Sequence, residues 1–214
     1  MAESITAIDI LMEPDATMVQ HAEAVNARLR GVFPKGYSLD ETHRPHLTTL
    51  QRFVRTVNLD RLCEAAGKII TSAHPETWML TAFKYYYVPS TEIGVAGIVV
   101  RPTDAWLEMQ HKLIDVVAPF TVKTATNDAF YELAEPNLGQ QLIDYVATFI
   151  PQHVGNNFSP HVSVGVATRD YLDKMLTEPF EEFTFSLAGA SVYQLGDYGT
   201  ARKVLKSWPF SASA

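Results

Sequence analysis

Apolar positions follow two different periods along the chain, which predicts a mixture of strands and helices. Short apolar runs at residues 5–11 and 93–100 are typical of strands. Residues 18–29 and 106–117 instead place apolar side chains every three or four positions, as amphipathic helices do. A proline with an aspartate nearby precedes each of these helical segments and favours a helix start there. The same order of strand and helix therefore occurs twice.

The pattern continues in a similar way after each unit. Residues 58–70 have helical periodicity and residues 78–88 are strand-like, while residues 168–176 again predict a helix. Residues 183–195 and 202–208 predict two strands joined by a glycine-containing turn. We therefore expect an α+β fold with two antiparallel-sheet lobes, outer helices and a central cleft.

We expect residues 1–214 to form a single bilobal unit, with approximate repeats at 5–90 and 93–208. Residues 121–157 interrupt the second repeat before the strand that carries its Pro-His motif. Inserted segments often cover a site and select the substrate, but they are also tolerated without a role. Both interpretations stay open at this point. The sequence has no low-complexity linker between the halves.

Composition limits the partners. With 47% hydrophobic and 19% charged residues the chain can bury a substantial core. The net charge is −7 and no basic run occurs, so the charge pattern expected for binding long nucleic acid is missing. The first residues form no basic leader, and no apolar stretch is long enough to cross a bilayer. We expect a cytoplasmic monomer, away from membranes, that binds a small ligand or a nucleic-acid terminus.

One short motif occurs twice. The segment PHLT at residues 45–48 recurs as PHVS at residues 160–163, 115 positions later. On a strand, side chains two positions apart share a face, so each copy presents a histidine beside a hydroxyl. Two such copies across a cleft supply an acid, a base and two hydroxyls, which suits attack on a phosphodiester. A single His-x-Thr often occurs by chance, but a matched pair indicates an active site.

Other chemistry is less well supported. His43 and His46 have the spacing of a helical zinc pair, but Pro45 between them opposes a helix and no cysteine or glutamate cluster is near. The lone Cys63 lies in a helix-like segment typical of a small buried hydrophobe. Ser163 lacks the Gly-x-Ser-x-Gly elbow of a serine hydrolase. We therefore expect no metal and no cofactor.

The paired PHLT and PHVS motifs, their separation and the duplicated layout resemble the two-histidine phosphoesterase superfamily. This superfamily includes RNA 2',3'-cyclic phosphodiesterases and 2'-5' RNA ligase-like proteins, and the resemblance is greatest to the bacterial ligase-like branch. It spans nearly the whole chain. It implies a bilobal fold, no metal, and action on cyclic or 2'-5' linked phosphates of nucleotides and RNA ends. It also implies that His46 and His161 are catalytic and that Thr48 and Ser163 bind phosphate.

The resemblance predicts a hydrolase of the cyclic phosphodiesterase type. We expect His161 to be the base and His46 the acid in ring opening, because histidine exchanges protons near neutral pH. Two alternatives remain: 2'-5' RNA ligase activity, and a non-catalytic module that binds nucleotides or RNA ends. The acidic composition favours a nucleotide cyclic phosphate or a short RNA terminus over a tRNA-sized partner.

Three more residues are candidates for substrate binding. Arg52 lies four positions after Thr48, so on a continuous strand it shares that face and neutralises phosphate; otherwise it is a solvated arginine. Tyr87 belongs to a run of three tyrosines, one side of which can stack on a base, although core packing is the alternative. Phe158 precedes the second motif and is either a base platform or a core residue.

Overall fold

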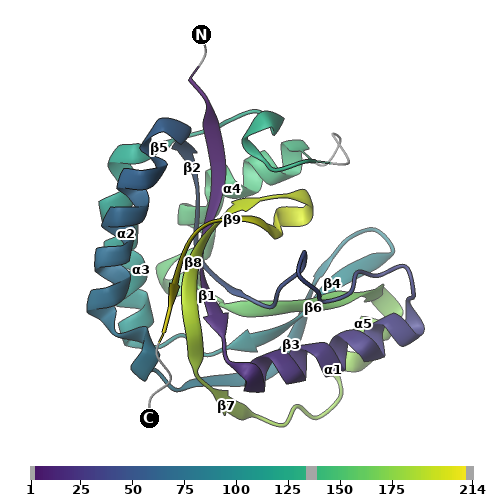
Figure 1. Ribbon diagram of the computed structural model, residues 1–214. Coiled ribbons are helices and arrows are strands. Elements are labelled where there is room, and N and C mark those ends of the chain that lie inside the picture. Colours follow the sequence, from purple (N-terminus) through teal and green to yellow (C-terminus); the bar gives the residue numbers. More distant parts are fainter. Residues whose placement is uncertain (1–2, 134–138, 211–214) are drawn as a thin grey trace.

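The computed structural model describes residues 3–133 and 139–210 and contains two antiparallel sheets with helices packed against them (Figure 1). The larger sheet has the strand order β5-β2-β1-β8-β9, and the smaller one has the order β6-β4-β3-β7. Every neighbouring pair of strands is antiparallel. The α+β class and the arrangement of two sheet lobes with outer helices are confirmed.

Most predicted elements are present with small differences at their ends, but the strand predicted over residues 183–195 is divided into two strands, β7 and β8, which belong to different sheets. The larger sheet contains β1 (Ile5–Pro14), β2 (Leu47–Arg55), β5 (Thr121–Val122), β8 (Leu187–Leu195) and β9 (Ala201–Pro209). The smaller sheet contains β3 (Leu80–Pro89), β4 (Ile93–Val100), β6 (His161–Thr168) and β7 (Phe183–Phe185). The helices are α1 (Ala16–Val32), α2 (Leu59–Ala73), α3 (Asp104–Val117), α4 (Gly139–His153) and α5 (Arg169–Leu176). The short edge strand β5 was not predicted.

The helix starts follow from capping residues in the sequence. The Asp15 carboxylate accepts hydrogen bonds from the backbone N–H groups of Thr17 and Met18 at the start of α1. The Thr103 hydroxyl accepts one from the N–H of Trp106 at the start of α3. Such caps satisfy N–H groups that have no partner within the helix. Both helices therefore begin where the strand before them ends.

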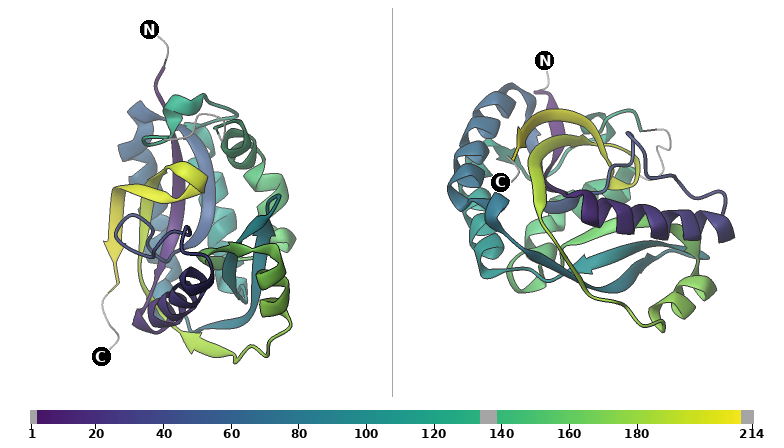
Figure 2. Two further views of the ribbon diagram at one scale, coloured as in Figure 1. Left: turned by 90° about the vertical axis from the view of Figure 1, so that its right-hand side faces the viewer. Right: turned by 60° about the horizontal axis from the view of Figure 1, so that its bottom comes forward.

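The two halves of the sequence exchange elements. Strand β3 follows the first motif but pairs with β4 in the smaller sheet, while β8 and β9 return to β1 in the larger sheet. Helix α1 packs on β6 of the smaller sheet, along which it lies in Figure 2, and α3 packs beside α2 on the larger sheet. Each lobe is thus built from both halves, and this brings the two motifs to one place.

A main core joins the two sheets, and a second core lies beneath α4. Trp106 is completely buried in the main core. The second core joins Ile143 and Val146 of α4 to Phe53 and Ala7 of the larger sheet. The described parts of the segment 121–157 are therefore packed on the sheet as part of the folded unit. None of the helices in the described ranges is both long and apolar enough to span a membrane.

Candidate active site

The two motif histidines are mounted in the same way. His46 directly precedes β2 and His161 begins β6, and these strands start near each other where the sheets meet (Figure 1). Nδ1 of His46 donates to the carbonyl of Arg44 at 2.7 Å, and Nδ1 of His161 donates to the carbonyl of Ser159 at 2.9 Å. Because a carbonyl only accepts, Nδ1 carries the hydrogen in both rings. Each histidine is left with Nε2 for proton exchange.

The electrostatic environment favours neutral His161. Burial lowers the pKa of His161 below its ordinary value, and the positive charges of His46 and His153 lower it further. The hydrogen bond to the Ser159 carbonyl opposes this shift. The interaction between the imidazoles of His46 and His161 places them in one site.

A buried carboxylate, which the sequence analysis did not single out, lies beneath the first motif. The Thr48 hydroxyl donates to Oδ2 of Asp9 at 2.6 Å, and Nε2 of Gln51 donates to the same oxygen at 3.0 Å. Burial raises the pKa of Asp9, while the charge of His46 and these hydrogen bonds lower it. The available signal was an acidic residue, Asp9, between the apolar residues Ile8 and Ile10 in the middle of strand β1.

Each motif is followed by a β-bulge at the third residue after its histidine. In β2 the extra residue is Thr49, because its neighbours on either side pair with consecutive residues of β1. In β6 the extra residue is Val164, and Gly165 beside it has a φ of 146°, a conformation that favours glycine. The bulges break the simple alternation of faces just beyond both sites.

A glutamine on α3 links the bulge of β2 to the loop before β6. Nε2 of Gln110 donates to the carbonyl of Thr49 at 2.9 Å, and its Oε1 accepts the N–H of Gly155 at 3.1 Å. Nε1 of Trp106, one turn earlier, donates to the Thr49 hydroxyl at 3.1 Å. The bulge after His46 is thereby tied to the loop that leads to His161.

An asparagine on α1 makes the equivalent link in the other direction. Nδ2 of Asn26 donates to the carbonyl of Val164 at 2.9 Å and to that of Tyr37 at 3.0 Å. Its Oδ1 accepts the N–H of Leu39, in the loop that leads to His46, at 3.2 Å. The side-chain amides of Gln110 and Asn26 thus donate to the backbone carbonyls of the two bulge residues, Thr49 and Val164, as expected for a duplicated layout.

The bulge also decides the position of Arg52. Beyond Thr49 the faces of β2 are exchanged, so Arg52 stands opposite Ile8, which points into the main core. Its Nη2 donates to the Thr121 hydroxyl at 3.3 Å, and burial lowers its pKa. The structure therefore places Arg52 on the face opposite Thr48, unlike the expectation from uninterrupted alternation.

The three tyrosines of β3 separate as alternation predicted. The ring of Tyr86 lies against His161 with 4.7 Å between centroids, and Tyr85 lies on the other face against Phe180. The hydroxyl of Tyr87 donates to Asp173 of α5 at 2.6 Å, so the structure does not place this candidate beside the histidines.

Phe158, the other aromatic candidate, is buried in the main core. Its ring packs edge-on against Trp106 with 5.3 Å between centroids. This contact corresponds to the core interpretation of Phe158.

Replacing Gly97 by alanine is expected to disturb His161 through Tyr86. Gly97 pairs with both Tyr86 and Ser163, and an added Cβ would overlap Cε1 of Tyr86 and lie 3.1 Å from the Val162 carbonyl. We expect kcat/KM to fall roughly 10- to 100-fold, as misplaced catalytic groups usually cause. Gly31→Ala is the matched control, because a Cβ at that position meets nothing within 4 Å. Equal activity of both variants would argue against a role for the Tyr86 contact.

Helix α4 brings two further side chains to the site. Burial raises the pKa of Tyr145 to about 12, and this tyrosine interacts electrostatically with Asp9. Its ring lies 4.8 Å from that of His153, whose pKa is lowered by burial. Helix α4 therefore places Tyr145 and His153 near the two motif histidines. The sequence offered no signal for them, because neither belongs to a repeated motif.

His43 is engaged in local contacts. Its Nδ1 lies 2.9 Å from the Thr42 hydroxyl, and its ring stacks on Tyr37 with 4.8 Å between centroids. In residues 3–133 and 139–210, no three His, Cys, Asp or Glu side chains form a group that could hold a metal ion.

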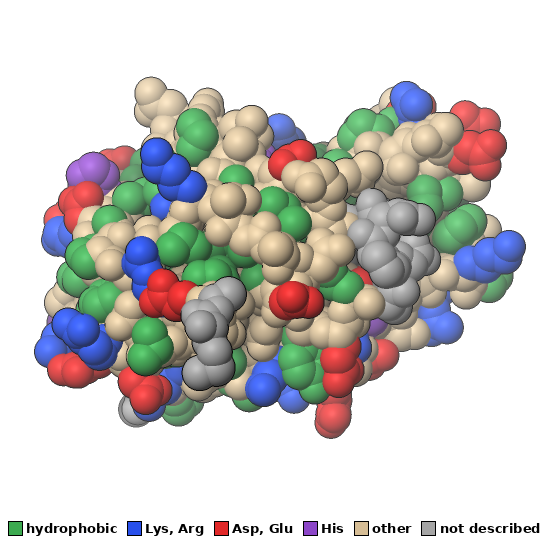
Figure 3. Space-filling view, turned by 90° about the horizontal axis from the view of Figure 1, so that it is seen from above, with side chains coloured by type: hydrophobic (Ala, Val, Ile, Leu, Met, Phe, Trp, Pro, Cys, Tyr) green, Lys and Arg blue, Asp and Glu red, His purple; other side chains and the backbone are tan. Residues whose placement is uncertain are grey.

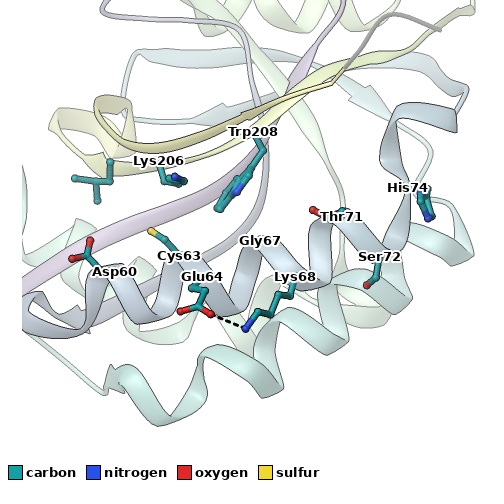
Figure 4. Close-up of a pocket in the computed structure, with 11 residues that line it drawn as sticks. Asp60, Cys63, Glu64, Gly67, Lys68, Thr71, Ser72, His74, Lys206 and Trp208 are labelled. Atoms are coloured by element: carbon teal, nitrogen blue, oxygen red, sulfur yellow. Dashed lines mark hydrogen bonds and ion pairs between the residues drawn. The ribbon is translucent and has the colours of Figure 1, made fainter.

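Two cavities differ in their distance from the motif histidines, and one of them adjoins His46. A cavity of about 330 Å³ adjoins His46 and has Arg44 and Tyr193 in its wall, with four carboxylates from Glu13, Glu23, Asp40 and Glu41. A larger cavity of about 780 Å³ lies between α2 and β9, away from both motifs (Figure 4). There burial raises the pKa of the Cys63 thiol, and Glu64 is paired with Lys68 at 2.7 Å. Of the four motif side chains, His46 lines the smaller cavity, and His161, Thr48 and Ser163 line neither of the two.

Comparisons with known proteins bear on the fold. No family model and no curated protein matches the chain. The solved structure of TT0787 from Thermus thermophilus aligns with a TM-score of 0.56 and 15% identity, over 95% of this chain and 97% of that one. Escherichia coli LigT, solved with 3'-AMP, aligns with a TM-score of 0.43 and 11% identity, over 98% and 99% of the two chains. Usb1 of Kluyveromyces marxianus, solved with uridine monophosphate, aligns with a TM-score of 0.44 and 13% identity, over 95% and 98%. With its two antiparallel sheets and its exchanged halves, the chain shares the overall fold of TT0787.

Proposed function

We propose that the chain is a metal-independent phosphodiesterase that hydrolyses 2',3'-cyclic phosphates or 2'-5' linkages of nucleotides and RNA ends. The matched mounting of His46 and His161 is the observation that carries this proposal. Both rings donate from Nδ1 to a carbonyl two residues earlier and keep Nε2 for the substrate. A binding module would not require a matched pair of proton-transfer groups.

The surroundings of the two histidines support different roles. The lowered pKa of His161 keeps its Nε2 unprotonated near neutral pH, so His161 takes a proton from the attacking water. His46 interacts with the carboxylate of Asp9, and its protonated Nε2 donates to the departing ribose oxygen. The water oxygen forms the new bond to phosphorus, and one ester bond breaks. Ligation would run the same exchange in reverse.

The surface supports a small substrate. Seen from above, the molecule shows acidic and basic side chains scattered among neutral ones, with no continuous basic area among the described residues of that face (Figure 3). The cavity beside His46 has four carboxylates and one arginine in its wall. Long nucleic acid depends on many cationic contacts to phosphates. We therefore assign the site to a nucleotide cyclic phosphate or a short RNA terminus.

The pH profile should reflect the depressed pKa of His161. A base works only when it is unprotonated, so kcat/KM rises with pH as His161 loses its proton. Since burial lowers this pKa, the rise should be centred below the ordinary value of 6.5. We expect a kcat/KM profile between pH 4.5 and 9 to show this limb in the parent and to lack it in His161→Ala. A limb centred well above 6.5 would contradict the assigned base.

The direct test is a panel of nucleoside 2',3'-cyclic monophosphates and 2'-5' linked dinucleotides, incubated in EDTA and analysed by chromatography against 2'- and 3'-phosphate standards. EDTA-resistant hydrolysis supports the proposal and identifies the ester bond that breaks. A folded parent protein that binds these compounds without converting them would contradict it and favour a binding role.

A further inference from the structure

Asp9 has fewer hydrogen-bond donors than a buried carboxylate requires. Its side chain is completely buried, and both of its donors, Thr48 and Gln51, reach the same oxygen, Oδ2. Among the described residues no donor reaches Oδ1 of Asp9, and none reaches Oε1 of Gln51. Buried acceptors without donors are unfavourable, and most of all on a charged carboxylate, so a proton that neutralises the carboxyl group lowers this cost.

The groups that face Asp9 offer little compensating charge. They are His46 ahead of β2, Tyr145 on α4 and Tyr193, the cross-strand partner of Asp9 on β8. Burial raises the pKa of both tyrosines, so both are neutral near pH 7. The charge that His46 carries when protonated lowers the pKa of Asp9, and an anion in the site would attract the same charge.

The hydrogen on Thr48 serves only one acceptor at a time. A threonine hydroxyl has a single hydrogen, and in the structure it is directed to Asp9. While that hydrogen is bound to Asp9, Thr48 presents only the lone pairs of its oxygen to an incoming phosphate. These lone pairs repel the phosphate oxygens. A protonated Asp9 reverses this arrangement, because its own O–H then donates to the Thr48 oxygen.

We propose that Asp9 takes up a proton when a phosphate group occupies the site, so that Thr48 turns its hydrogen from Asp9 to a phosphate oxygen. This inference rests on the proposed function, in which Thr48 binds phosphate. One proton moves from solvent to the carboxylate, and only hydrogen bonds are exchanged. Asp9 is a positioning residue, because it acts through Thr48 and does not touch the substrate.

Calorimetry with sulfate tests the proton uptake. Sulfate stays a dianion over the whole pH range, so every proton taken up on binding goes to the protein. Titrations near pH 7.5 in buffers of different ionisation enthalpy give the number of protons per sulfate bound. We expect the parent to take up more protons than Asp9→Asn, by a difference approaching about one proton. We also expect the sulfate Kd to rise more steeply with pH in the parent. Equal uptake in the two proteins would overturn the role of Asp9.

Two further variants keep the test decisive. Thr48→Val removes the hydroxyl between Asp9 and the anion, so its proton uptake should fall to that of Asp9→Asn, even if the latter does not fold. Glu64→Gln, a change at an exposed carboxylate on α2, should retain the parent's uptake. A folded parent that binds neither sulfate nor a cyclic nucleotide would contradict both this inference and the proposed function. Sulfate binding with unchanged uptake would contradict only the inference.

Discussion

His46→Ala and His161→Ala should each lower kcat/KM for a nucleoside 2',3'-cyclic monophosphate by roughly 10²- to 10⁴-fold, the range that general acid–base catalysis supplies. Each ring is held by one hydrogen bond to a carbonyl at the start of its strand, so its removal should leave the fold intact. Steady-state kinetics and thermal unfolding of both variants check these two statements together. The control His111→Ala alters an exposed histidine on α3 and should behave as the parent.

The two variants should also differ from each other when the leaving group changes. A nitrophenolate leaves without a proton, so the acid is dispensable on bis(p-nitrophenyl) phosphate, whereas the base is still needed to activate water. We therefore expect His46→Ala to recover much of the parent's activity on this substrate and His161→Ala to remain impaired. The reverse order would assign the roles the other way round.

Trp106→Ala should cause the largest loss of stability, about 3–5 kcal/mol in the free energy of unfolding. The indole is completely buried and packs on Trp78 and Phe158, with centroids 6.1 and 5.3 Å away. Its Nε1 also holds the Thr49 hydroxyl in the bulge after Thr48. Urea denaturation followed by circular dichroism measures the change.

Trp106→Phe separates packing from hydrogen bonding. Phenylalanine keeps most of the apolar volume but leaves the Thr49 hydroxyl without its donor, so we expect a loss of about 1–3 kcal/mol from this polar group and the smaller ring. If Trp106→Ala were as stable as Trp106→Phe, the main core would not depend on this side chain.

The features of the site that could be predicted depend on residues close together in the sequence. The histidines and hydroxyls of the two motifs were singled out because strand alternation acts over two residues, and in the structure the charge of His46 lowers the pKa of His161. Alternation also separated Tyr86 from its two neighbours, although the sequence analysis chose Tyr87 as the candidate. The choice between the two sides of β3 depends on which helix covers each face, and the sequence of β3 does not contain that information.

The unpredicted part depends on contacts between distant segments. The bulge at Thr49 exists because β2 pairs with β1 in one register, and it moves Arg52 away from the site. Asp9 acquires its role from Thr48, 39 positions later in the chain. Likewise, the exchange of β3 and β8 between the sheets is a pairing of segments far apart in sequence, which a hydrophobic pattern does not encode.

The most direct test of the central claim compares the parent, the two single histidine variants and the double variant His46→Ala/His161→Ala on one 2',3'-cyclic monophosphate in EDTA. Groups that act together on one transition state give strongly non-additive losses. We therefore expect each single variant to lose nearly all activity and the double variant to be little worse than the poorer single one. Full activity in either single variant would contradict a two-histidine mechanism.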